Sequence, residues 1–376
     1  MPKMRVPGVQ TSASLVALAR AVTPIVVGAI CLAGAAAPAQ GQALCLPSLG
    51  LGSVCVPAGG TGTPDLLAPV SALGPVVATL DDGAQAVSTL DLTSIGTAAD
   101  VTLTTVGRAA IATVDRPGVL INSAGTATAQ VNSIATSGTG ATGALLRAAD
   151  RVIFTADDVV GTLGAAAPAL DIEGGTISVD GDLFRTGGDD ANGVELVSLS
   201  GPIDLDADAI ETSGDRSTAA LLRSAGSVGV DVGVLRTRGS QALGLDIGTD
   251  PATCVLLGNG GCDVTAAADR ITTGGFGGIG ALVSAATGVT TIDVDVLQTG
   301  GDEAAGLSLA TDAAVCVVLG AGACDQGFTV GTLATQGARS PGALVRAAGT
   351  ITGSVNLLTT NGRDAIGLDL ASAPDA

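Results

Sequence analysis

The sequence predicts an all-β protein, a parallel β-helix with about 25 residues per coil and roughly ten coils. Three observations lead to this fold class. Similar segments recur at nearly constant spacing, apolar and polar residues alternate within each segment, and the composition suits a thin core.

The repeat consists of ten similar segments, such as GALLRAADR from Gly143 and GALVRAAGT from Gly342. Successive segments begin 25, 25, 25, 26, 25, 36, 26, 36 and 25 residues apart. Their anchor residues are Gly118, Gly143, Pro168, Gly193, Ala219, Gly244, Gly280, Gly306, Gly342 and Gly367. A fixed period in this range is typical of stacked architectures, whereas a propeller blade needs about 40 residues and a left-handed helix needs a six-residue repeat that is missing here.

Within a unit, the side chains follow a period of two. GTISVDGDLFRT at 175–186 and TTIDVDVLQT at 290–299 alternate aliphatic with polar residues, which predicts strands with one buried face. Each unit has room for about three short strands separated by Gly-rich corners such as TGGD. Gly is expected at corners because they often require positive φ.

The composition limits the core and the partners. Among 376 residues there are 56 Gly and 4 Phe but no Trp, Tyr or His, and 47% of the residues are hydrophobic. Short aliphatic strands can build a thin core without aromatic residues. The formal net charge of −19 argues against nucleic acid or anionic lipid as a partner.

Three regions are expected along the chain: a signal peptide at 1–43, an irregular N-terminal cap at 44–93 with a disulfide loop and a short helix, and solenoid repeats at 94–376. Lys3 and Arg5 precede the uncharged run from Ala21 to Ala37, and small residues follow it. This pattern predicts an exported protein, with a retained membrane anchor as the alternative.

The cysteines also fit an exported chain. Cys31 leaves with the signal peptide, and the remaining six fall into close pairs that predict local disulfides: Cys45–Cys55, Cys254–Cys262 and Cys316–Cys324. The last two pairs lie in the 36-residue steps at identical offsets from their anchors, which predicts two hairpin inserts at the same corner. Metal binding is the weaker alternative, because the spacings are long and His is absent.

One stretch resembles a catalytic signature. Gly300 to Glu303 read Gly-Gly-Asp-Glu, four of the five letters carried by enzymes that make cyclic dinucleotides, but Ala304 replaces the final Phe. Related stretches begin at Thr186 and Thr212, and such recurrence indicates a structural corner. With no His or Tyr and no Lys after the signal peptide, no general base apart from carboxylates is available. We therefore predict no enzyme and no cofactor.

Charged corners raise two further questions. Asp189, Asp190 and Asp215 occupy equivalent corners of neighbouring coils and are weak candidates for Ca²⁺ ligands, although a solvated acidic corner explains them as well. A basic residue follows three anchors by four positions, and each is expected to pair with an outward Asp on an adjacent coil. These residues are Arg147, Arg223 and Arg346.

The repeats and the signal peptide together resemble the passenger domains of bacterial autotransporters and related adhesin-like surface proteins. The resemblance covers Gly118 to Ala376. It implies a right-handed β-helix at the cell surface or outer membrane, or outside the cell, that binds an unknown surface ligand, either protein or glycan. The export barrel of that family is missing from this chain. The alternatives are a polysaccharide-active β-helix enzyme with paired carboxylates, such as Asp157 and Asp158, and a structural surface-layer protein.

Overall fold

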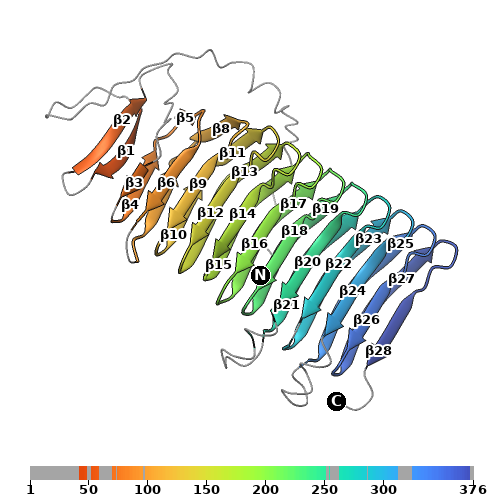
Figure 1. Cartoon of the computed structure of the whole chain (residues 1–376). Helices are drawn as coiled ribbons and strands as arrows, with labels where there is room; N and C mark the ends of the chain where they lie inside the picture. Colours follow the sequence, from red (N-terminus) through yellow and green to blue (C-terminus); the bar gives the residue numbers. More distant parts are fainter. Residues whose placement is uncertain are drawn as a thin grey trace, which may run out of the picture. The chain divides into compact units, whose positions relative to one another are not determined.

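The computed structural model describes residues 42–48, 52–58, 70–72, 74–95, 98–250, 254, 262–285, 287–311 and 324–372. Every element with bounds in these residues is a β-strand, and the strands stack as a solenoid of about ten turns with roughly 26 residues per turn. The predicted all-β parallel fold is confirmed (Figure 1). The predicted signal peptide lies almost wholly outside the described residues.

Two long sheets form the walls of the solenoid, one with 16 strands and one with 12. The larger sheet holds β1 (Gln42–Ser48), β2 (Gly52–Ala58), β4 (Val76–Leu80), β5 (Gln85–Ala86), β7 (Val101–Thr105), β8 (Ala110–Val114), β10 (Ala127–Val131), β11 (Ser133–Ser137), β13 (Arg151–Leu163), β15 (Thr176–Thr186), β17 (Ile203–Thr212), β19 (Val228–Thr237), β21 (Val264–Thr273), β23 (Thr290–Gly300), β25 (Gln326–Gln336) and β27 (Ile351–Asn361). The smaller sheet holds β3 (Val70–Ala72), β6 (Leu90–Ser94), β9 (Val119–Ser123), β12 (Ala144–Ala148), β14 (Leu170–Gly174), β16 (Val194–Ser198), β18 (Ala220–Ser224), β20 (Leu243–Thr249), β22 (Ile279–Ala285), β24 (Ala305–Thr311), β26 (Ala343–Ala347) and β28 (Leu368–Ser372).

The expected three short strands per coil are separate only in the first coils, where β10 and β11 are distinct strands. From β13 onward the two segments merge into one strand of 10 to 13 residues. This longer strand still bends, because the register between β13 and β15 shifts between Ala156 and Val159. The bend keeps aliphatic residues directed inward on both halves of the strand.

The register between coils reproduces the spacing of the repeat. Val228 pairs with Val264 and Thr290 with Gln326, so both 36-residue steps are inserts between coils that otherwise stack normally. One anchor assignment was wrong by a single position. Ala169, rather than Pro168, stands opposite Gly143, because Ala144 pairs with Leu170.

The solenoid begins earlier than the predicted boundary at Ser94. Strands β3 and β6 already pair in parallel, and β4 pairs in parallel with β7, so coil stacking starts at Val70. The repeat was not recognised here because the anchor pattern is degenerate. The preceding segment is not irregular: β1 and β2 form an antiparallel hairpin, and β1 pairs with β4. The described part of 44–93 contains no helix.

The core is thin, as the composition predicted. Within β14, β16 and β6 the side chains alternate strictly between buried and partly exposed. Phe154 and Phe184 are the largest side chains fully buried in the described residues, and their ring centroids lie 6.3 Å apart on adjacent coils. Elsewhere Phe328 and stacked rows of Ala, Val, Leu and Ile fill the narrow interior.

At the corner after the long strand, glycines of successive coils stack directly on one another and form a column. At each of these glycines a Cβ atom would lie only 1.8–2.5 Å from the carbonyl oxygen of the equivalent glycine in the preceding coil. The backbones therefore stack closer than any side chain permits. The glycines with such contacts are Gly164, Gly188, Gly214, Gly239, Gly275, Gly301, Gly337 and Gly362.

Two further positions complete each corner. Two residues before the glycine is a Thr, which is buried in all of these coils except the last. The hydroxyl of Thr186 donates to the carbonyl of Ala191 at 2.8 Å, and those of Thr162, Thr212 and Thr335 make the equivalent bond, whereas the hydroxyls of Thr237, Thr273 and Thr299 have no hydrogen-bond partner among the described residues. Two residues after the glycine the chain has positive φ, as at Asp190 and Gln241. The N–H of that residue donates to the next coil; Gln241 donates to Phe276 at 2.7 Å. The recurring Gly-Gly-Asp stretch is thus a stacking corner.

The glycine column predicts opposite outcomes for two adjacent residues of one motif. A Cβ at Gly301 would lie 2.2 Å from the carbonyl oxygen of Gly275, and φ there is +108°, whereas a Cβ at Gly300 meets nothing closer than 3.8 Å. We expect Gly301→Ala to lower the free energy of unfolding by roughly 2–4 kcal/mol and Gly300→Ala to leave it within about 0.5 kcal/mol. Denaturant titration of both variants measures the difference. Equal stabilities would contradict the steric origin of the column.

The positive φ of Gln241 predicts that a glycine at this position would stabilise the protein. Gln241 has φ +56°, where its Cβ is sterically strained, and Gly has no Cβ and avoids this strain. We expect Gln241→Gly to raise the free energy of unfolding by about 0.5–1 kcal/mol, after subtraction of the greater freedom of Gly in the unfolded chain. The control Gln241→Ala keeps Cβ and should change little. A glycine variant less stable than the alanine variant would contradict the assignment.

Candidate functional site

The acidic corner residues form hydrogen bonds and ion pairs with residues of the adjacent coils. One carboxylate oxygen of Asp189 accepts the backbone N–H of Asp215 at 2.9 Å, and Asp215 in turn accepts the N–H of Ser240 at 2.8 Å. Asp190 forms an ion pair with Arg216 at 2.5 Å, and hydrogen bonding to this guanidinium lowers the pKa of Asp190. The weak calcium candidates therefore serve as caps and ion pairs between coils.

The stretch that resembles a catalytic signature follows the same rule. Asp302 accepts the backbone N–H of Ala338 at 2.8 Å, Glu303 pairs with Arg339, and Ala304 is buried. In the described part of the chain, no group of three or more Cys, Asp or Glu side chains is arranged to hold a metal ion. The recurring Gly-Gly-Asp sequence is therefore explained by contacts between stacked coils.

The predicted arginine pairs are confirmed. Each guanidinium reaches an aspartate on the next coil, at 2.5–2.8 Å: Arg147–Asp171, Arg223–Asp246 and Arg346–Asp369. These side chains lie on the smaller sheet and are partly solvated, so each pair contributes at most about 1 kcal/mol. Their role is to hold adjacent coils in register.

The cysteines begin and end the inserts. Cys254 and Cys262 form a disulfide with their Cα atoms 5.6 Å apart. Cys254 has helical backbone conformation and donates its N–H to Asp250, so this insert does not start as the strand of a hairpin. Cys324 is also disulfide-bonded, while Cys316 and most of both inserts lie outside the described residues. In the hairpin of β1 and β2, Cys45 stands directly opposite Cys55.

The inserts leave equivalent corners of the solenoid. The first follows β20 and the second follows β24, and these strands are separated by β22 alone in the smaller sheet. After each insert an aspartate caps the following coil: Asp263 accepts the N–H of Val289 at 2.8 Å, and Asp325 accepts that of Thr350 at 2.7 Å. The expectation that both inserts leave the same corner is confirmed.

An acidic row crosses the larger sheet. Asp180, Asp206 and Asp231 stand directly opposite one another on β15, β17 and β19. Partial burial raises the pKa of Asp206, and repulsion from Asp180 and Asp231 raises it further. The pKa of Asp182 is raised by partial burial and by the charges of its acidic neighbours, with Asp208 the strongest. This row therefore carries electrostatic strain.

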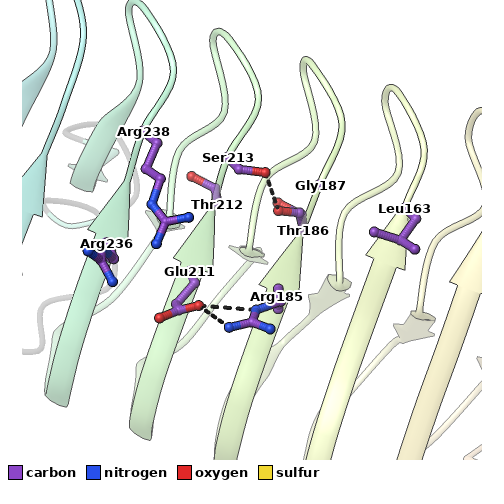
Figure 2. A pocket seen from close by; sticks show the side chains of 9 residues that line it. All are labelled: Leu163, Arg185, Thr186, Gly187, Glu211, Thr212, Ser213, Arg236 and Arg238. Atoms are coloured by element: carbon purple, nitrogen blue, oxygen red, sulfur yellow. Dashed lines mark hydrogen bonds and ion pairs between the residues drawn. The ribbon is translucent and has the colours of Figure 1, made fainter. Parts of the chain in front are cut away.

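A groove beside this row has the opposite charge. It lies where β13, β15, β17 and β19 meet their corners, and it has a volume of about 250 Å³. Figure 2 shows the residues that line it: Leu163, Arg185, Thr186, Gly187, Glu211, Thr212, Ser213, Arg236 and Arg238. Thr186 and Thr212 in this lining are buried, and Gly187 and Ser213 are small.

The charges of the groove do not cancel. Glu211 lies between Arg185 and Arg236 in register, and its carboxylate binds Arg185 at 2.5 Å. Arg236 and Arg238 are exposed and form no ion pair with the described residues. The groove thus has two uncompensated positive charges in a chain with a net charge of −19. Only the in-register pairing of adjacent coils brings these residues together, so their spacing in the sequence does not predict the groove.

A second hollow of about 330 Å³ lies on the smaller sheet, beside Ser94 and Arg147. Arg147 is engaged there by Asp171 at 2.8 Å and by Glu173 at 3.3 Å. Its guanidinium is therefore already neutralised. The groove around Arg236 and Arg238 is the stronger candidate for recognising a charged ligand.

Comparison with known proteins adds no relative. No protein family matches the chain, and neither a curated protein nor a solved structure matches it. In the residues that the structure describes, no helix has the length and apolar character required to cross a membrane.

The acidic row predicts a pH-dependent change in stability. The pKa of Asp206 is raised above its ordinary value of 3.8, so the folded state favours the protonated carboxyl group. The folded protein is therefore most stable, with respect to this group, below pH 3.8, and it loses that stability as the pH rises through the folded-state pKa. We expect Asp206→Asn to raise the thermal midpoint at pH 7, and the gain to shrink as pH falls toward 3.8 or as salt is added.

Asp293→Asn is the matched control for this prediction. Asp293 has the same position on β23, but its in-register neighbours are Ala267 and Thr329, which carry no charge. Replacing it relieves no repulsion from a directly opposite carboxylate and should change the thermal midpoint less. An equal gain from both variants would show that the stacked row is not the cause.

Proposed function

We propose that the protein is a non-catalytic, secreted or cell-surface scaffold of the adhesin-like kind. The observation that carries this proposal is the placement of the two inserts. They leave equivalent corners after β20 and β24, with one coil between them, on a stack whose register is otherwise continuous. Loops on a rigid support are where recognition usually resides.

The corner chemistry supports a display role. Aspartates such as Asp189 and Asp302 and arginines such as Arg223 are engaged in contacts between coils. Groups of this kind serve the stack and are not positioned around a reacting atom. The residue inventory agrees, because the chain has no His or Tyr and its single Lys is Lys3. These charged residues are thus explained by assembly of the solenoid.

The proposed location follows from the N-terminal sequence and the cysteines. Export through the predicted signal peptide would expose the cysteines to an oxidising compartment, where disulfides such as Cys254–Cys262 persist. A role as the passenger of an autotransporter would require an export barrel. A surface ligand, either protein or glycan, is the expected partner.

A polysaccharide-active enzyme is the main competing function. Such an enzyme needs two carboxylates that flank one bond. Asp157 and Asp158 are adjacent on β13, close enough to Asp182 for their charges to act on its carboxylate. The enzyme hypothesis predicts the release of reducing ends from a polysaccharide and the loss of that activity in Asp182→Asn. The scaffold hypothesis predicts binding without cleavage.

Deletion of the inserts tests the display function. Removing residues 252–262 and 314–324 restores two 25-residue steps and takes out both cysteine pairs. Beads coated with the intact chain are expected to attach to a panel of immobilised glycans and matrix proteins. The deletion should reduce attachment to at least one of these surfaces by about tenfold, which corresponds to about 1.4 kcal/mol.

A matched variant separates loss of the loops from loss of the fold. Cys254→Ser with Cys262→Ser keeps the insert but opens its disulfide, and circular dichroism of each variant should keep its β-sheet signal. Attachment unchanged by the deletion would favour a surface-layer role. No attachment to any surface, with cleavage of a polysaccharide, would favour the enzyme.

A further inference from the structure

The groove around Arg236 and Arg238 is a break in an otherwise regular wall. Residues opposite Arg236 in the neighbouring strands are Glu211 and Thr272. Glu211 is bound by Arg185 in a two-point contact, with Nε at 3.1 Å and Nη2 at 2.5 Å from the same carboxylate oxygen. Glu211 therefore stands in register between two arginines and is bound to the one on β15, which leaves Arg236 and Arg238 without an ion pair in the described residues.

The space in front of these arginines is held open by small residues. The position of Arg238 is occupied by Gly187 and Ser213 in the two preceding coils and by Gly274 in the following coil. A Cβ at Gly274 would meet nothing closer than 3.8 Å, so the site is roomy on that side. Figure 2 shows Arg236 and Arg238 on the side of Glu211 away from Arg185. Both side chains are exposed and therefore accessible to a ligand.

We propose that this groove binds one anionic group of an acidic glycan through Arg236 and Arg238. A guanidinium presents paired N–H donors that match the two oxygens of a carboxylate or sulfate. Ser213 adds a hydroxyl that now makes only a long contact, at 3.4 Å, with the carbonyl of Thr186 and can rotate toward a ligand. Two guanidinium groups and one hydroxyl suffice to hold a single charged sugar unit.

The surroundings select a ligand with widely spaced charges. Asp180, Asp206 and Asp231 stand in one row of the same sheet, so a densely charged polymer laid along the wall would be repelled. None of the lining residues is aromatic, which removes the stacking platforms that single-stranded nucleic acids use. The volume of about 250 Å³ suits one unit of a longer chain rather than an enclosed small molecule.

This site goes beyond the display function, because it does not include the inserts. The groove lies at the corner after β15, β17 and β19, in the larger sheet, whereas the inserts follow β20 and β24 in the smaller sheet. Binding at the groove and attachment through the inserts can therefore fail independently. The insert-deleted chain provides the means to separate them.

The test is calorimetric titration of the full chain, at low salt, with a largely methyl-esterified oligogalacturonate whose few free carboxylates are widely spaced. We expect binding that weakens as salt is added, and no binding of the fully methyl-esterified oligosaccharide, which has the same sugar units without charge. Arg236→Gln with Arg238→Gln should weaken binding by at least about tenfold, as expected for loss of charge-assisted hydrogen bonds. The insert-deleted chain should bind like the intact chain.

A charge-matched double variant is the control. Arg151→Gln with Arg270→Gln removes the same two charges from the larger sheet outside the groove, and should change the affinity by less than about twofold. All four arginines are exposed, so both double variants should keep the thermal midpoint of the parent chain.

Parallel titrations identify the anion. A sulfated oligosaccharide that binds more tightly than the oligogalacturonate would assign the site to sulfate and keep the proposal. Tighter binding of polyglutamate would overturn the glycan assignment in favour of an acidic peptide. Equal weakening by the two double variants, or binding of the methyl ester, would overturn the site itself.

Discussion

The close contact between glycine backbones at one corner is the constraint on which the solenoid depends. From Gly164 to Gly362, a glycine carbonyl of one coil occupies the space that a Cβ of the next would need. The coils can therefore approach to the spacing that β-sheet hydrogen bonds require on both walls at once. A larger residue there would push the coils apart at the corner and break the register of both sheets.

The other features of the corner follow from that contact. The chain turns sharply after the glycine, so a residue such as Gln241 or Asp190 takes positive φ, and its N–H reaches the next coil. In four of these coils a buried Thr before the glycine donates to a carbonyl within the turn, as Thr186 does to Ala191. Aspartates such as Asp215 then bind N–H groups that the turn leaves open. The result happens to spell four letters of a nucleotide-cyclase signature at Gly300 to Glu303.

The sequence predicted what repetition encodes directly. The spacing of the anchors gave the coils, alternation gave the buried faces, and equivalent offsets gave pairs such as Arg147 with Asp171. It could not predict the coil that starts at Val70, because that coil lacks the anchor pattern. It also missed the groove, since Arg185, Glu211 and Arg236 are about 25 residues apart and meet only through in-register pairing. The Arg-Thr-Arg stretch around Thr237 was the one local signal available.

In a solenoid, repetition itself creates order along the wall. A residue type that recurs in every coil becomes a continuous row, so recurrent glycine gives a tight corner and recurrent aspartate gives a strained acidic row such as Asp180, Asp206 and Asp231. Such rows are explained by stacking and solubility. Specific recognition requires departure from the row, because a ligand must distinguish one coil from the next. Two such departures are the inserts after β20 and β24, marked by 36-residue steps in the register, and the arginines that flank Thr237. Selection for binding would act there.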